Sequence, residues 1–188
     1  MKKHIVALCL CLLTAAAVKA QKMSFGLKGG LNISDVSNIN GDNRLSGHLG
    51  LYFNSRLNAQ WSIQPELLYS GQGQQYRALG NEYTLALNYI QIPLMFQFRP
   101  VKQVYLEVGP QLGFLIAANV KDDGDKEEVD GAYKKADFGL NFGAGFMVTS
   151  KLGFYGRYNV GLADINDVSA LSDRHNRVGQ LGLFIRLQ

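Results

Sequence analysis

The chain has 188 residues, of which 47% are hydrophobic and 18% are charged, and its formal net charge is +4. Three of the positive charges, on Lys2, Lys3 and Lys19, lie in an N-terminal segment that we expect to be removed, which leaves the rest close to neutral. This balance argues against nucleic acid as a partner. The mean hydropathy of −0.05 is typical of strands that alternate apolar and polar residues, and it argues against a bundle of apolar membrane helices.

The N-terminal segment has the pattern of a secretory signal peptide. Lys2 and Lys3 precede an apolar run over residues 5–18, which is short for a membrane span. Small residues at the end of this segment favour cleavage after Ala20. An uncleaved membrane anchor is the alternative.

These features divide the chain into a signal peptide over residues 1–20 and an exported part over residues 21–188, whose length fits one domain. Both cysteines, Cys9 and Cys11, lie in the signal peptide. We therefore expect the exported domain to have no disulfide bond and no thiolate metal site.

After the signal peptide, apolar and polar residues alternate with a period of two in eight separate runs. The first run sets Phe25, Leu27 and Leu31 on one face against Lys28 and Asn32 on the other. This period predicts β-strands with one apolar and one polar face. The eight expected strands cover residues 24–33, 45–57, 61–70, 83–99, 104–116, 137–148, 152–162 and 180–187.

The run over residues 83–99 departs from simple alternation. Its apolar positions shift from Leu85 and Leu87 to the even-numbered residues that begin at Ile90. This shift predicts a β-bulge near Tyr89. Pro93 lies on the polar side of the run, and its missing N–H predicts a local irregularity in the hydrogen-bond ladder.

The connections between the expected strands alternate strictly between short and long. This asymmetry is typical of outer-membrane barrels, whose tight turns face the periplasm and whose longer loops face the cell exterior. We therefore expect both chain ends on the periplasmic side. The short connections cover residues 58–60, 99–103 and 149–151, and the long ones cover residues 35–44, 71–82, 118–136 and 164–176.

Alternation alone is also compatible with a soluble barrel that buries its apolar face inward. Three features favour the membrane: the polar faces are rich in glycine, lysine and glutamate gather in the connections, and aromatic residues mark both ends of the strands. We predict an all-β fold, an eight-stranded antiparallel up-and-down transmembrane β-barrel with its apolar face toward lipid. The expected aromatic girdles are Phe25, Trp61, Phe98 and Phe146 beside the short turns, and Tyr69, Tyr83, Phe114 and Phe138 beside the long loops.

Several segments together carry a family resemblance. They are FGLKGGLNISD at residue 25, SIQPELLYSGQG at 62, YIQIPLMFQF at 89, YLEVGPQLGFLI at 105, DFGLNFGAGF at 137 and YNVGLADIN at 158. With these motifs the chain resembles the PorT-like, or porin-family, outer-membrane β-barrel proteins of Bacteroidetes. The resemblance implies an outer-membrane location and folding by the barrel-assembly machinery. It implies little about chemistry, and we do not transfer the secretion role of one member class.

Six charged residues fall on the polar faces of the expected strands and should point into the lumen. A lone charge inside a barrel is costly to desolvate, so we expect these residues to pair in a structural network. An eight-stranded barrel is about wide enough for its own side chains, which favours a plugged lumen. A pair of catalytic carboxylates and a selectivity ring are the alternatives. The six residues are Lys28, Arg56, Glu66, Glu107, Arg157 and Arg186.

Two further features are candidates for chemistry. The acidic segment over residues 122–130 lacks the glycine and the glutamate of a calcium-binding EF-hand loop, so we expect a solvated loop without a metal. It could also meet lipopolysaccharide through bridging divalent ions. His48, expected in the lumen, and His175, expected in a mobile loop, invite comparison with outer-membrane lipid hydrolases, but no nucleophile motif surrounds them. We therefore expect no catalytic residue, no metal site and no cofactor.

The sequence favours a structural or interaction protein with a plugged lumen, which acts through its long outer loops, chiefly residues 118–136. A narrow channel for small solutes is the alternative, and a lipid-modifying enzyme is the second alternative. The expected partners are outer-membrane lipids and lipopolysaccharide, the barrel-assembly machinery during biogenesis, and an extracellular or membrane-protein partner.

Overall fold

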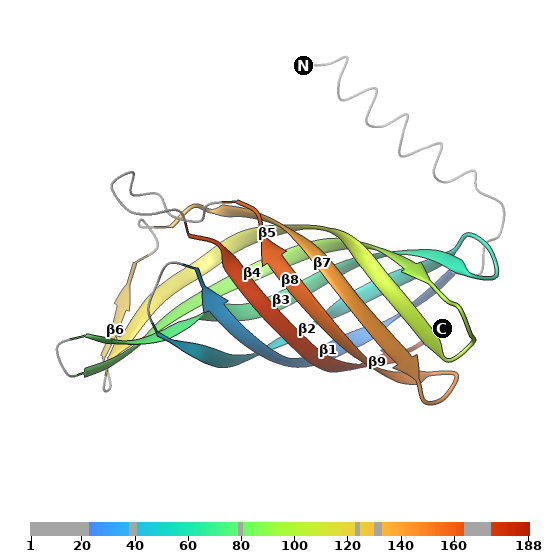
Figure 1. The fold of residues 1–188 in the computed structure, drawn as a ribbon, viewed down its shortest axis with the longest axis horizontal. Coiled ribbons are helices and arrows are strands. Elements are labelled where there is room, and N and C mark those ends of the chain that lie inside the picture. The colour runs from blue at the N-terminus through green and yellow to red at the C-terminus, as the bar shows by residue number, and fades with distance from the viewer. Residues whose placement is uncertain (1–22, 38–40, 79–80, 123–124, 130–132, 164–173) are drawn as a thin grey trace, which may run out of the picture.

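The computed structural model describes residues 23–37, 41–78, 81–122, 125–129, 133–163 and 174–188, and these residues form a β-barrel (Figure 1). The predicted signal peptide, residues 1–20, lies outside the described residues. The strands are β1 (Met23–Val36), β2 (Asp42–Arg56), β3 (Trp61–Ala78), β4 (Asn81–Phe98), β5 (Val104–Asp122), β6 (Asp125–Glu128), β7 (Ala136–Met147), β8 (Leu152–Gly161) and β9 (Asn176–Arg186).

The sheet closes into a ring of eight long antiparallel strands, which confirms the predicted fold. Each long strand pairs with its neighbour along the chain, and β1 pairs with β9 from Gly26–Arg186 to Val36–Asn176. The short strand β6 pairs only with the end of β5. The three short connections lie where the sequence predicts them, at the same end of the barrel as the start of β1 and the C-terminus (Figure 1). No helix among the described residues is long and apolar enough to cross a bilayer.

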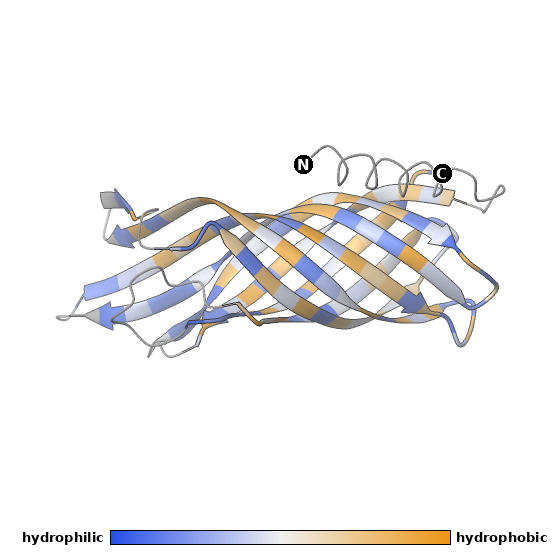
Figure 2. Ribbon diagram, turned by 90° about the horizontal axis from the view of Figure 1, so that it is seen from above, coloured by the Kyte–Doolittle hydropathy of each residue, from blue (hydrophilic) through white to orange (hydrophobic). Residues whose placement is uncertain are grey.

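The outward face of the barrel is apolar, as predicted. Large hydrophobic side chains on every long strand point away from the lumen, so that Leu31 on β1 is 57% exposed and Leu49 on β2 is 64% exposed. Apolar and polar residues therefore alternate along the strands (Figure 2). Near the short turns, the rings of Trp61 and Phe98 lie 4.9 Å apart between centroids. This band of outward apolar residues is the surface that an outer-membrane barrel presents to lipid.

Two predicted long loops are partly strands instead. Most of the predicted loop over residues 71–82 belongs to β3 and β4, which continue past the apolar band as a polar hairpin (Figure 2). Tyr83, expected in the outer aromatic girdle, stacks on Tyr76 across this hairpin with centroids 5.5 Å apart. In the predicted loop over residues 118–136, the end of β5 pairs with β6. Cross-strand pairs of this kind stabilise extended strands outside the membrane.

The predicted change of face in β4 is wrong. Leu85 and Leu87 point into the barrel like the later odd-numbered residues, and both are at most 2% exposed. A register shift does occur at Asn88 and Tyr89, but the extra residue lies in the partner strand β5, where Ile116 is left without a partner in β4. The irregularity predicted around Pro93 is present, since the β3–β4 ladder has no pairs between Pro65–Leu94 and Leu68–Gln91.

The hydrogen-bond ladder between β2 and β3 is also interrupted, between Asn43 and His48. Side chains replace the missing ladder bonds there. The carbonyl group of Gly71 accepts hydrogen bonds from the Asn32 amide at 2.7 Å and from the Ser46 hydroxyl at 2.7 Å. Backbone groups of the wall are thereby satisfied where strand pairing fails. A hollow of about 480 Å³ beside the interruption is lined by Leu45, Leu49 and Tyr69 from the outward face and by His48 from the lumen.

The band of outward leucines yields a test of which surface meets lipid. Leu51, 44% exposed, lies on β2 between the outward residues Leu27 and Leu67, whereas Leu57, 49% exposed, follows the strand in a short turn. Arginine in place of a lipid-facing residue costs about 2–4 kcal/mol at the bilayer midplane and about 0–1 kcal/mol near its interface. Leu51→Arg should therefore lower the free energy of unfolding in lipid vesicles, measured by urea titration, much more than Leu57→Arg. Equal losses would contradict the outward placement of Leu51 in the membrane.

Candidate functional site

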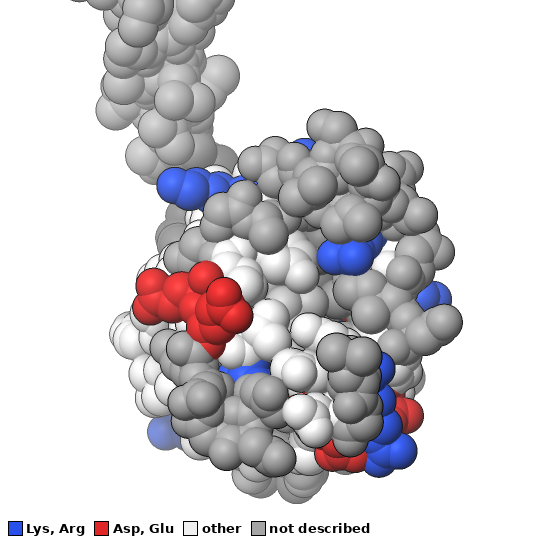
Figure 3. All heavy atoms as spheres, turned by 90° about the vertical axis from the view of Figure 1, so that its left-hand side faces the viewer, with Lys and Arg blue, Asp and Glu red and all other residues white. Residues whose placement is uncertain are grey.

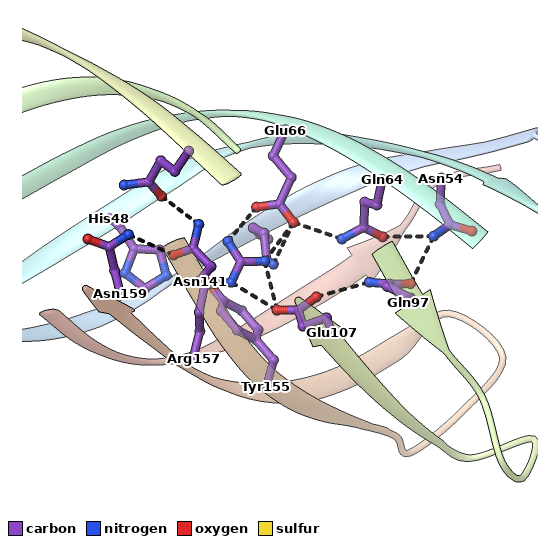
Figure 4. Close-up of polar contacts among 12 residues, drawn as sticks. His48, Asn54, Gln64, Glu66, Gln97, Glu107, Asn141, Tyr155, Arg157 and Asn159 are labelled. Carbon is purple, nitrogen blue, oxygen red and sulfur yellow. Dashed lines mark hydrogen bonds and ion pairs between the residues drawn. The ribbon is translucent and has the colours of Figure 1, made fainter. Parts of the chain in front are cut away.

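The centre of the lumen contains a cluster of four charged side chains, which we call the lumen cluster: Lys28, Glu66, Glu107 and Arg157 (Figure 4). They come from β1, β3, β5 and β8 and are between 2% and 4% exposed. The alternation of each strand directs them inward, because their neighbours on both sides face lipid. Four of the six predicted lumen charges therefore meet at one place.

Each carboxylate in the lumen cluster has several donors. Glu66 accepts hydrogen bonds from Lys28 Nζ at 3.0 Å and from two nitrogens of Arg157 at 2.8 and 2.9 Å. Glu107 accepts one from Arg157 Nε at 2.9 Å. The cluster holds two positive and two negative charges, so its net charge is zero. Such pairing offsets the desolvation that would otherwise make buried charges prohibitive.

An aromatic ring completes the surroundings of the cations. Lys28 Nζ lies 3.9 Å from the ring centroid of Tyr155, and the Arg157 guanidinium lies 5.8 Å from it. Cation–π contacts of this kind are stronger when they are desolvated, as here. Tyr155 therefore contributes to holding the charges in place.

Amide side chains extend the polar network toward both ends of the barrel (Figure 4). On the turn side, Gln64 donates to Glu66 at 2.8 Å and Gln97 donates to Glu107 at 3.1 Å. Asn54 bridges the two glutamines at 3.0 and 2.9 Å. These three amides are not among the predicted lumen residues, although their positions on the polar faces of the strands are a signal for them. The network thus includes neutral residues as well as charged ones.

The other two of the six predicted lumen charges, Arg56 and Arg186, lie outside the lumen cluster. Arg56 ends β2 and Arg186 ends β9, so the two side chains lie at the turn-side rim and line a hollow there. Arg186 donates to the carbonyl of Ser150 at 3.2 Å instead of to a carboxylate. The prediction of a six-residue network is therefore wrong for these two residues, because strand parity gives the direction of a side chain but not its depth.

Two side-chain clusters lie on either side of the charges. Toward the short turns, Tyr52, Tyr105, Tyr155 and Phe184 pack together, and the centroids of Tyr52 and Phe184 are 6.1 Å apart. Toward the long loops the interior contains an apolar cluster that includes Leu85 and Leu87, beside buried polar residues such as Gln74. Figure 3 faces that end, where uncharged side chains fill the centre and charged ones lie mainly toward the rim. Buried side chains of these two clusters thus lie in the described lumen on either side of the lumen cluster.

The two histidines that the sequence suggested as candidates, His48 and His175, occupy different places. His48 is buried in the lumen, where Nδ1 lies 2.7 Å from Asn32 Oδ1 and Nε2 contacts the Tyr155 hydroxyl. Both ring nitrogens are thus engaged, and neither is free to activate a serine. His175 lies at the loop-side end, where its Nδ1 is 2.9 Å from the carbonyl of Ala163 and its backbone N–H donates to Ser37.

Part of the acidic segment over residues 122–130 forms the β5–β6 hairpin instead of the expected open loop. Within the described residues, no group of three or more histidine, aspartate and glutamate side chains is arranged to hold a metal ion.

Comparisons with known proteins agree with this architecture. The sequence model of the family described as "Outer membrane protein beta-barrel domain" matches residues 19–167. No curated protein matches the chain.

Solved structures of small outer-membrane proteins have a similar fold. Neisserial surface protein A is 13% identical, with a TM-score of 0.55 over 87% of this chain and 96% of that chain. Ail, the attachment invasion locus protein of Yersinia pestis, is 16% identical, with a TM-score of 0.50 over 87% of this chain and 98% of that chain. OprG from Pseudomonas aeruginosa is 14% identical, with a TM-score of 0.48 over 89% and 97%. At these identities the likeness concerns the fold alone.

The lumen cluster predicts a contrast between two glutamates. Glu66→Ala would leave Lys28 and Arg157 without one shared carboxylate in a dry interior, and breaking a buried pair of this kind costs about 3–5 kcal/mol. Glu82→Ala removes a carboxylate that also binds an arginine, Arg77, but at an exposed site where solvent screens the pair. Glu66→Ala should therefore lower the free energy of unfolding strongly, with little change for Glu82→Ala. The free energy is measured by urea titration, and heat-modifiable migration on gels verifies folding. Similar losses in the two variants would contradict the pairing of Glu66 with two buried cations.

Proposed function

Because the chain belongs to the outer membrane protein beta-barrel domain family, we propose that it is a plugged barrel that presents its loop-side hairpins to partners. The observation that carries this proposal is the lumen itself, in which a neutral charge cluster crosses the barrel between two packed layers. A conducting pore needs a continuous water-filled path. Paired and buried charges support a structural plug instead.

The loop-side end supplies the surface for interaction. Strands β3 and β4 project as a paired hairpin with exposed Arg77 and Glu82 near its tip, and β5 and β6 form a second hairpin with exposed Glu127. Paired strands have less conformational freedom than open loops, so they lose little conformational entropy when a partner binds. Suitable partners are lipopolysaccharide, an extracellular molecule or a neighbouring membrane protein.

The arrangement in the membrane follows from the same proposal. Cleavage after Ala20 would release the exported domain, and the barrel-assembly machinery would insert it with the short turns and both ends in the periplasm. The motifs of the PorT-like barrels support membership of that narrower group. The engagement of both His48 ring nitrogens supports a protein without enzymatic activity.

A plugged lumen makes a prediction about conduction. The purified barrel in planar lipid bilayers should give no steady channels, and liposomes that contain it should not swell in small sugars, because side chains fill the lumen. A wide porin in the same lipids is the positive control. Steady, unitary conductance of the folded protein would overturn the plug and favour the narrow-channel alternative.

The proposed orientation makes a separate prediction. With Cys9 and Cys11 in the predicted signal peptide, a single introduced cysteine can be labelled selectively. On intact cells, a membrane-impermeant maleimide should label Glu82→Cys at the β3–β4 hairpin, whereas Lys151→Cys in a short turn should react only after the outer membrane is permeabilised. The reverse pattern would show that the barrel is inserted the other way round.

A further inference from the structure

The turn-side mouth of the barrel gathers arginines from three separate strand ends. Arg56 ends β2, Arg99 follows β4, and Arg186 ends β9. Together with Lys102 they line a single hollow of about 720 Å³. We call this group the arginine mouth.

The arginines face the axis of the barrel and not the lipid. Arg56 continues the inward row of Tyr52 and Asn54 on β2, and Arg186 lies two residues beyond the inward Phe184. Arg99 donates to Oε1 of the inward residue Gln97 at 3.3 Å. Any group that reaches all three must therefore enter the mouth from the aqueous side.

No carboxylate of the described residues forms an ion pair with these three arginines. The described acidic partners bind elsewhere, with Glu66 and Glu107 on Lys28 and Arg157, Glu82 on Arg77, and Asp35 on Arg177. The lumen cluster has a net charge of zero, so it does not balance the charge of these arginines. The mouth therefore carries positive charge that the described protein does not balance.

Two of the guanidinium groups also have unused donors. The Nε atoms of Arg99 and Arg186 are buried and have no hydrogen-bond partner among the described residues. A buried donor without a partner is costly. Burial, and then the nearby charges of Arg56 and Arg186, lower the pKa of Arg99. The free mouth is thus held in an unfavourable electrostatic state that an anion would relieve.

We propose that the arginine mouth binds a phosphate group, which enters from the side of the short turns. Guanidinium groups recognise phosphate oxygens through paired, charge-assisted hydrogen bonds, and three such groups line this hollow. The phosphate comes either from a soluble molecule or from the headgroup of a lipid at the rim. The site does not depend on the proposed role of the loop-side hairpins, since it lies at the opposite end of the barrel.

The first experiment measures phosphate binding by isothermal titration calorimetry on the folded protein in an uncharged detergent at low, constant ionic strength. Inorganic phosphate should bind, and Arg99→Gln should weaken the affinity by about tenfold or more, as expected for the loss of a charge-assisted hydrogen bond. Arg56→Gln, at an exposed residue, provides a second variant should Arg99→Gln fail to fold. Lys121→Gln, which removes an exposed charge at the loop-side end, should bind like the wild type.

A second experiment identifies the source of the phosphate. Micelles of the uncharged detergent alone carry no phosphate and serve as the reference for micelles that also contain phosphatidic acid. Weaker binding of inorganic phosphate in the micelles with phosphatidic acid assigns the site to a lipid headgroup, and unchanged binding assigns it to a soluble phosphate. Absence of phosphate binding by the wild type, or equal binding by the wild type and both arginine variants, would refute the site.

Discussion

Inside a lipid bilayer no water is available to the backbone, so each N–H and C=O group of a membrane-crossing chain needs a partner within the protein. The ring that closes through β1 and β9 meets this requirement. Even where the β2–β3 ladder is interrupted, Asn32 and Ser46 donate hydrogen bonds to the carbonyl of Gly71. In a closed ring, the number of strands largely sets the diameter of the interior. The composition of the lumen follows from that diameter.

A narrow interior explains both the presence and the pairing of the buried charges. The lumen cluster joins four strands, so it connects positions that the backbone ladder links only through intervening strands. Slippage of one strand by a single residue would turn its charge toward lipid, at a large cost in free energy. A well-packed apolar interior could match the stability of the cluster. The charges therefore contribute to the register of the barrel more clearly than to its overall stability.

The sequence was a good guide to direction and a poor guide to depth. Period-two alternation predicted the closed ring, the apolar outer face and the inward direction of Lys28 and Glu66. It could not place Arg56 and Arg186 at the rim, because parity is the same along the whole strand. Leu85 and Leu87 point inward, contrary to the prediction, because they belong to an apolar cluster in the loop-side lumen, where the rule of an apolar outside and a polar inside fails. The strand extensions beyond the membrane depend on cross-strand pairs such as Tyr76 and Tyr83, which periodicity within one strand does not show.

Three glycines on the polar faces lie opposite large rings in the lumen. A methyl group added at Gly145 would overlap the ring of Tyr105, and one added at Gly153 would overlap the ring of Phe184. Gly182 has the same relation to Tyr155, whose Cε1 atom would lie 2.8 Å from such a methyl group. Each ring thus occupies space that a missing side chain leaves on another strand. In evolution, the two members of such a pair would change together: a relative with a larger residue at one position would need a smaller one at the other, even though the two are far apart in the chain.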